Sequence, residues 1–95
     1  MAQFNFRIDR RVTTYESLNY VVFAEDEDDA IKLMEAEFKS QELPSKRSHE
    51  PSSSVQFCDA TLLEDEDYIH EFVNEDGTFT RVLVNEETGD DIEVE

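Results

Sequence analysis

Cysteine, glycine and proline are scarce in this 95-residue chain, and tryptophan is absent. The single cysteine, Cys58, excludes an internal disulfide and a zinc site built from several cysteines. With two glycines and two prolines, the turns must depend on Asn, Asp and Ser. No apolar run approaches the ~18 residues of a membrane span, and no basic stretch followed by an apolar run opens the chain. We therefore expect a cytoplasmic protein.

Basic residues are also scarce, and they are unevenly placed. Residues 48–95 hold fifteen acids and one base, Arg81, whereas residues 1–47 hold ten acids and seven bases. Like charge on a small body destabilises the compact state by self-repulsion, and solubility alone needs a net charge of magnitude ~2–8. The net charge of −17 therefore indicates a surface used for binding. It disfavours direct binding to nucleic acid or to an anionic membrane.

The apolar pattern predicts a single α+β domain over residues 1–95. Apolar and polar residues alternate in Phe4–Ile8, which we expect to continue to Thr14 as a strand. Leu18–Ala24 is apolar on both faces and is predicted to be the return strand of a hairpin, with a central place in the sheet. The second half is predicted to be a β-meander, so that the order is ββα-loop-ββββ with one helix packed on a face of an antiparallel sheet. Its expected strands are 55–63, 68–73, 79–84 and 91–95.

A helix is predicted from about Asp26 to Gln41. Ala30, Ile31, Met34 and Phe38 recur on one helical face. The acids of Glu25–Asp29 stand where an N-cap and the helix dipole favour negative charge, so we interpret them mainly as a cap. The following segment, residues 44–54, has two prolines, five serines and no large apolar side chain. We expect it to be a flexible loop.

Catalytic and metal chemistry find little support in the sequence. His49 lies in the serine-rich loop and His70 in an expected strand, where a histidine is usually packed. Cys58 has no basic neighbour in sequence that would lower the pKa of its thiol. No acidic run has the glycine and distal glutamate of a calcium loop, and no nucleophile-elbow, phosphate-loop or zinc-protease motif occurs. We expect a non-enzyme with no cofactor and no metal site.

The acidic clusters of the second half are the candidate partner-binding residues. Alternate residues on a strand are about 6.6–6.8 Å apart, so acids in the last strand and its turns can line one edge. Duplex DNA carries one charge per ~1.7 Å of axis, which a rim of a dozen carboxylates approximates loosely. The pattern predicts a surface that resembles nucleic acid to a basic partner. Its residues are Glu64, Asp65, Glu66, Asp67, Glu75, Asp76, Glu86, Glu87, Asp90, Asp91 and Glu93.

A basic group in the first half of the chain contrasts with these acidic clusters. Its residues are Arg7, Arg10 and Arg11. Exposed arginines on a strand commonly offset neighbouring acids within the same molecule, and we expect that role here. The alternative is contact with an acidic patch on a partner or on a second copy.

Two resemblances bear on function. The stretch Val21-Val22-Phe23-Ala24, followed by Glu25–Asp29 and Ala30-Ile31, resembles the small ββα units of phage and plasmid proteins. In size and charge, the whole chain is similar to phage-encoded acidic inhibitors of the anti-CRISPR and anti-restriction class, many of which mimic DNA. That resemblance implies a host defence nuclease or ribonucleoprotein complex as the target, inside a bacterial cell.

Three hypotheses follow. The first is an inhibitor that occupies a nucleic-acid channel by charge mimicry. The second is an immunity protein that neutralises one cognate nuclease toxin through a few central hot-spot residues. The third is an adaptor whose charge serves solubility only.

Overall fold

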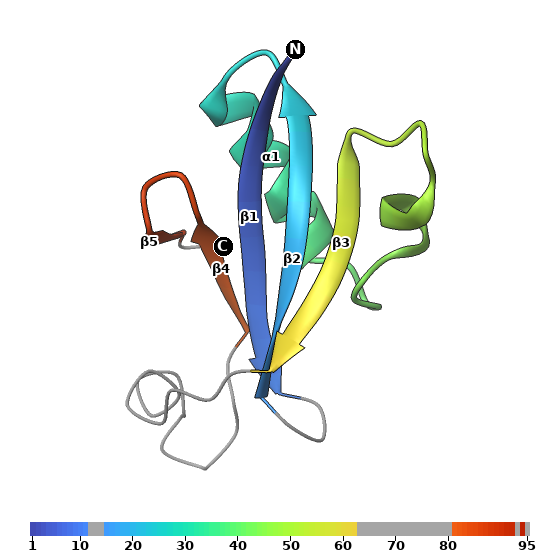
Figure 1. The fold of residues 1–95 in the computed structure, drawn as a ribbon, viewed down its shortest axis with the longest axis vertical. Coiled ribbons are helices and arrows are strands. Elements are labelled where there is room, and N and C mark those ends of the chain that lie inside the picture. The colour runs from blue at the N-terminus through green and yellow to red at the C-terminus, as the bar shows by residue number, and fades with distance from the viewer. Residues whose placement is uncertain (12–14, 63–80, 93, 95) are drawn as a thin grey trace.

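The chain folds into a five-stranded antiparallel sheet with one α-helix against it, in a computed structural model that describes residues 1–11, 15–62, 81–92 and 94 (Figure 1). The predicted α+β class is confirmed. The elements in chain order are β1 (Ala2–Arg11), β2 (Tyr15–Ala24), α1 (Glu27–Phe38), the 3₁₀ helix η1 (Lys46–His49), β3 (Val55–Leu62), β4 (Val82–Asn85) and β5 (Asp90–Ile92).

The β1–β2 hairpin is the framework of the fold. Its strands pair antiparallel without interruption from Ala2 opposite Ala24 to Arg11 opposite Tyr15. The predicted alternation is confirmed, since Phe6, Ile8, Leu18, Tyr20 and Val22 are all within 1% of complete burial. The polar residues between them therefore lie on the other face of the sheet.

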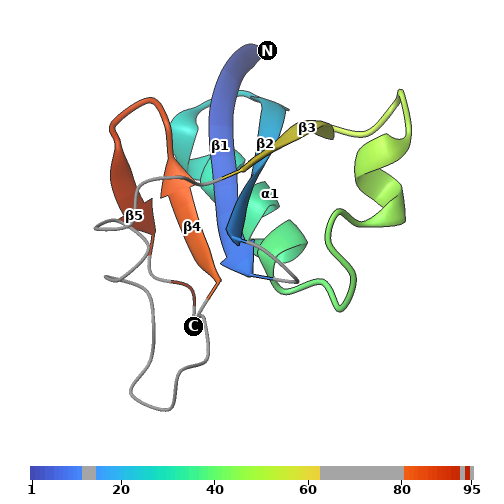
Figure 2. The same cartoon turned by 60° about the horizontal axis from the view of Figure 1, so that its bottom comes forward.

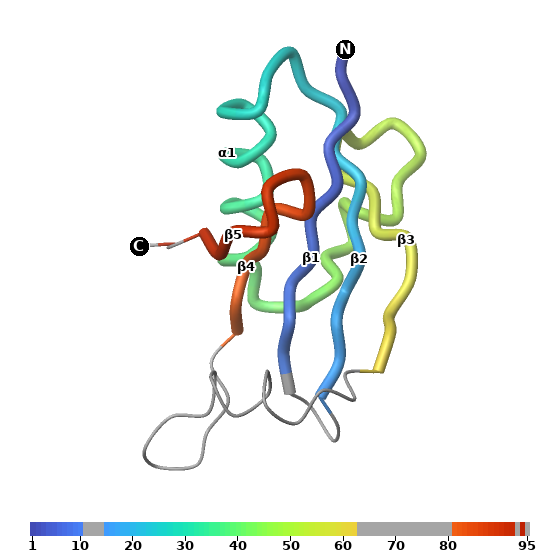
Figure 3. Tube along the Cα trace, turned by 60° about the vertical axis from the view of Figure 1, so that its left-hand side comes forward, coloured from blue at the N-terminus to red at the C-terminus, as the bar shows by residue number. Residues whose placement is uncertain are grey.

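Helix α1 begins where the capping pattern predicts. The side chain of Asp26 accepts a hydrogen bond from the backbone N–H of Asp29 at 2.9 Å, as an N-cap does. Ala30 and Met34 are fully buried, and Ile31 and Phe38 are partly buried against the same core. The helix ends at Phe38, before Gln41, because Ser40 N–H bonds back to the carbonyl of Glu37 and closes the last turn. Figure 3 shows α1 running beside the sheet.

The sheet order β3-β2-β1-β4-β5 corrects the predicted meander. β3 pairs with β2, and β4 pairs with β1, so the two strands lie on opposite edges of the hairpin (Figure 2). Each outer edge of the long hairpin pairs with a strand from the second half of the chain, which satisfies the backbone groups of that edge. Leu83 lies opposite Ile8 and is fully buried, which fixes β4 there. The prediction of an interior strand at Leu18–Ala24 is confirmed.

The β4–β5 hairpin is the part of the predicted meander that the described residues contain. Ile92 and Val94 pack against the core, as expected. The turn uses Gly89 at φ +78°, a conformation that other residues rarely adopt. The expected strand 68–73 and the turn at 74–77 lie outside the described residues.

The serine-rich segment 44–54 has a defined conformation. It contains η1, and Ser48 is 1% exposed. Ser48 Oγ donates to the carbonyl of Ser45 at 2.7 Å, and Gln56 Nε2 donates to the carbonyls of Glu50 and Ser53, both at 2.6 Å. Local hydrogen bonds thus connect this segment to its neighbours, although it has no large apolar side chain to pack. The flexibility expected for it stays a prediction.

Candidate acidic interaction surface

Four of the eleven predicted partner-binding acids fall on described residues, and the structure brings these four together. Glu86, Glu87, Asp90 and Asp91 are all exposed in the turn and strand that follow β4. Asp90 and Asp91 belong to β5, opposite Asn85 and Val84. The remaining seven lie outside the described residues, namely Glu64, Asp65, Glu66, Asp67, Glu75, Asp76 and Glu93.

The turn that carries these acids is held by its own hydrogen bonds. The carbonyl of Asn85 accepts from Gly89 N–H at 2.7 Å, and Asn85 Oδ1 accepts from Glu87 N–H at 3.0 Å. Glu87 Oε1 accepts from both the backbone N–H and Nδ2 of Asn5 on β1, at 2.9 and 3.2 Å. Glu87 thereby ties the turn to the neighbouring strand, so one of the four acids has a structural task.

The first turn of α1 adds a second group of exposed carboxylates. In Figures 1 and 2, the β4–β5 turn and the first half of α1 both lie toward the β1 edge of the β1–β2 hairpin, with α1 behind the sheet. We call the two groups together the acidic pole. Its residues, all exposed, are Glu25, Asp26, Glu27, Asp28, Asp29, Glu86, Glu87, Asp90 and Asp91.

No residue of the acidic pole forms an ion pair within the described part of the chain. The ion pairs found there are Arg7–Asp9 at 3.2 Å and Arg10–Glu16 at 2.8 Å, and neither includes a residue of the pole. Arg10 also donates to the carbonyl of Leu43 at 2.7 Å. The predicted intramolecular role is therefore confirmed for Arg7 and Arg10, whose charges are used away from the pole.

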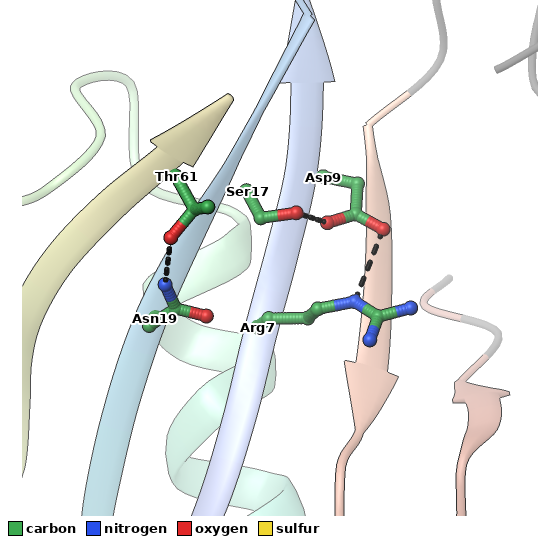
Figure 4. A network of polar contacts seen from close by, with 5 residues as sticks. All are labelled: Arg7, Asp9, Ser17, Asn19 and Thr61. Carbon is green, nitrogen blue, oxygen red and sulfur yellow. Dashed lines mark hydrogen bonds and ion pairs between the residues drawn. The ribbon is translucent and has the colours of Figure 1, made fainter. Parts of the chain in front are cut away.

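A polar network covers part of the sheet face opposite α1 (Figure 4). Asp9 is fully buried, and it accepts hydrogen bonds from Ser17 Oγ on β2 and from Arg7 Nε. Asn19 Nδ2 donates to Asp59 Oδ1 at 2.7 Å and to Thr61 Oγ1 at 3.0 Å on β3. The bonds from Ser17 and Arg7 satisfy the buried carboxylate of Asp9, as burial requires. The separate bonds of Asn19 connect β2 to β3.

A second buried carboxylate was missed by the sequence interpretation. Glu37 on α1 is 4% exposed, and its Oε2 accepts from Tyr20 Oη and from Ser45 N–H, each at 2.9 Å. Its Oε1 accepts from Ser45 Oγ. Burial, with the adjacent Glu37 carboxylate, raises the pKa of Tyr20 far above its ordinary value. The signal was present, because Ala30, Met34 and Glu37 share the buried helical face.

Of the three residues considered for catalysis, two fall on described residues. His49 is exposed in η1, and its ring meets Phe57 edge-on at 5.6 Å between centroids. Cys58 is exposed on β3, and His70 lies outside the described residues. Within the described ranges, no three His, Cys, Asp or Glu side chains gather as a metal site would need. No helix in that part of the chain is long and apolar enough to cross a membrane.

Comparison with protein-family models, with curated proteins and with solved structures finds no match to this chain.

Proposed function

We propose that this protein acts without catalysis, as an acidic inhibitor that covers a basic surface of a nucleic-acid-binding protein or ribonucleoprotein complex. The observation that carries the proposal is the acidic pole, nine exposed carboxylates of which none forms an ion pair within the described residues. Such a cluster costs folding free energy through repulsion. A basic partner that binds nucleic acid recovers that energy, because its Lys and Arg side chains exchange phosphates for carboxylates.

The fold supports this use because it presents the carboxylates on ordered backbone. Five of them lie at the N-terminus of α1, and four lie in the β4–β5 turn and in β5. The helix is anchored through buried Ala30 and Met34, and the hairpin through buried Leu83. The charges are thus held in place before binding, which reduces the entropy lost in the complex.

The proposal is tested by capture from a bacterial lysate with two charge-reversed variants. The test variant changes four acids of the pole to lysine, namely Asp28, Glu86, Asp90 and Asp91. The control variant changes four acids elsewhere in the described chain to lysine, namely Glu35, Glu42, Glu50 and Asp59, and loses one exposed hydrogen bond, from Asn19 to Asp59. Both variants change the net charge equally. Glu87 and Asp26 are left intact because they hold the turn and the helix cap.

We expect the wild-type chain and the control variant to capture the same basic nucleic-acid-binding protein, with less retained after a wash at higher salt. The test variant should lose that protein. Retention of one partner by both variants at high salt would contradict a carboxylate-dependent interaction and would leave the adaptor hypothesis as the better one.

The immunity-protein hypothesis remains as a second candidate because of one exposed aromatic side chain. Phe23 on β2 is 38% exposed and is the one aromatic side chain among the exposed large apolar residues of the described chain. Immunity proteins of this kind would bind one nuclease through a small aromatic centre. A Phe23→Ala variant that loses its partner at every salt concentration would favour this candidate.

A further inference from the structure

An apolar groove adjoins the acidic pole. A cavity of about 390 Å³ lies where β2 ends and α1 begins. Phe23 and Ala24 of β2 line it together with Leu33 and Ala36 of α1. Glu25 and Asp29, two members of the acidic pole, line it as well. The described chain thus places exposed apolar surface directly beside its highest concentration of exposed carboxylates.

The groove continues along α1. A second cavity of about 260 Å³ shares Leu33, Ala36 and Ser54 with the first. Its lining also includes Glu37 and Arg47, so it is more polar at that end. The two cavities together follow the side of α1 that faces the segment leading into β3. An apolar pocket with charged groups at one end suits a side chain that carries charged neighbours.

From these contacts we infer that the groove binds a basic segment of the partner protein, with one large apolar side chain inserted beside Leu33 and Ala36. The Lys or Arg residues next to that side chain would meet Glu25 and Asp29. The inference rests on the proposed function, because it takes the partner to be a basic protein. It adds the site of the anchor and the chemistry of the segment that fills it.

Charge decides among the possible occupants. A second copy of this chain also carries a net charge of −17 and would be repelled at the groove mouth. Anionic lipid is repelled for the same reason. Two cationic groups line the first cavity, Lys32 and the α-amino group of Met1, against the carboxylates of Glu25 and Asp29. Asp26, Glu27 and Asp28, which lie between those two acids in sequence, leave the mouth of the groove with an excess of negative charge. A cationic polypeptide segment with an apolar side chain is complementary to both parts of this surface.

The carboxylates and the apolar groove contribute differently to binding. Long-range attraction by the carboxylates raises the association rate and weakens with salt. An apolar side chain buried in the groove slows dissociation, and this contribution does not depend on screening. A partner that needs both would be distinguished from other basic proteins, which charge alone would not achieve.

The test uses two short synthetic peptides of Lys and Arg that differ at one central position, Phe in one and Ser in the other. We measure their affinities for the whole chain by fluorescence anisotropy at low and moderate salt. The Phe peptide should bind at least roughly tenfold more tightly, because burial of a phenyl side chain is worth that much. The ratio of the two affinities should persist as salt weakens both.

A matched pair of variants locates the effect. Ala36 is exposed and lines both cavities, so Ala36→Trp fills the groove without changing the charge. Ala60 is exposed on β3 and lines neither cavity, so Ala60→Trp is the control. The advantage of the Phe peptide should vanish in Ala36→Trp and remain in Ala60→Trp. In the wild-type chain, the Phe peptide should change the NMR amide chemical shifts of Phe23, Leu33 and Ala36. This measurement locates the bound peptide even if Ala36→Trp does not fold.

Four results would overturn the inference. Equal affinity for the two peptides would remove the groove but leave the acidic-surface proposal standing. A Phe preference that survives in Ala36→Trp, or shift changes confined to other residues, would place the anchor elsewhere. Failure of both peptides to bind at low salt would overturn the groove and the proposed function together.

Discussion

At the scale of single residues, the two buried carboxylates are the costliest groups in the described structure. Asp9 and Glu37 are removed from water, and each is compensated by hydrogen bonds from neighbouring elements. Glu37 links three parts of the fold, because its partners Tyr20 and Ser45 stand on β2 and just before η1. Removing one partner of such a buried group costs more than the bond itself contributes, since the other remains unsatisfied.

The first prediction concerns this cluster. Tyr20→Phe removes the hydroxyl that donates to Glu37 and should lower the free energy of unfolding by about 1.5–3 kcal/mol, the range for hydrogen bonds to charged groups. In a Glu37→Ala background, the same substitution should cost clearly less, because the acceptor is already gone. Urea denaturation of the four proteins of this cycle measures the coupling. Equal costs in both backgrounds would show that Tyr20 and Glu37 do not interact.

The second prediction concerns alkaline pH. Burial and Glu37 raise the pKa of Tyr20 in the folded state, whereas the unfolded chain ionises this residue near its ordinary value of 10.0. Above that pH the unfolded state binds fewer protons than the folded state, so stability must fall as pH rises. The decline should be shallower in Tyr20→Phe. Parallel declines of the two proteins between neutral and strongly alkaline pH would contradict the raised pKa.

At the scale of elements, local patterns were enough to predict some structures and not others. The β1–β2 hairpin and α1 follow from alternation, from helical spacing and from the Asp26 cap, which depend on neighbours in sequence. The placement of β3 and β4 on opposite edges of that hairpin does not. Either edge satisfies a strand's backbone equally well, and the choice depends on long-range packing such as Leu83 opposite Ile8.

The serine-rich segment shows a second limit. Its composition predicts a loop, yet Ser48 is buried and Ser45 binds Glu37. Side-chain hydrogen bonds of this kind leave no periodic signal in the sequence. The acidic pole was anticipated in part. The sequence assigns the turn acids Glu86 to Asp91 to binding and those at the start of α1 mainly to a cap, because it does not show that both groups lie toward the same edge of the hairpin (Figures 1 and 2).

The third prediction separates capping from charge at the start of α1. Asp26→Ala and Asp28→Ala each remove one carboxylate from the same crowded cluster, but only Asp26 accepts the hydrogen bond from Asp29 N–H. Asp26→Ala should therefore be less stable than Asp28→Ala by about 1 kcal/mol. Thermal or urea unfolding of the two variants makes the comparison. Equal stability would mean that the cap contributes nothing beyond its charge.

At the scale of the whole molecule, charge is the dominant feature. Net −17 on a domain with a radius of gyration of 13.1 Å places many carboxylates within or near one Debye length of each other. The core that opposes this repulsion is small, being formed mainly by the hairpin, α1 and Leu83. A protein with this much repulsion among its carboxylates is expected to gain stability when salt screens the charge or a basic partner binds to it.

The fourth prediction follows from this repulsion. Raising sodium chloride from low to moderate concentration should raise the Tm, because screening weakens repulsion among the acids more than it weakens the two ion pairs of the described residues. Differential scanning calorimetry at several salt concentrations measures the trend. A Tm that falls over this range would show that attractive charge pairs dominate the folded state.

The central claim is that the acidic pole takes the place of nucleic acid on a basic partner, and competition for that partner tests it most directly. The captured partner is bound to this protein and then challenged with the DNA or RNA that it normally binds. Mutual exclusion is expected, with recovery of nucleic-acid binding when the Asp28, Glu86, Asp90 and Asp91 reversal variant replaces the wild-type chain. A stable ternary complex of partner, nucleic acid and this protein would contradict the claim.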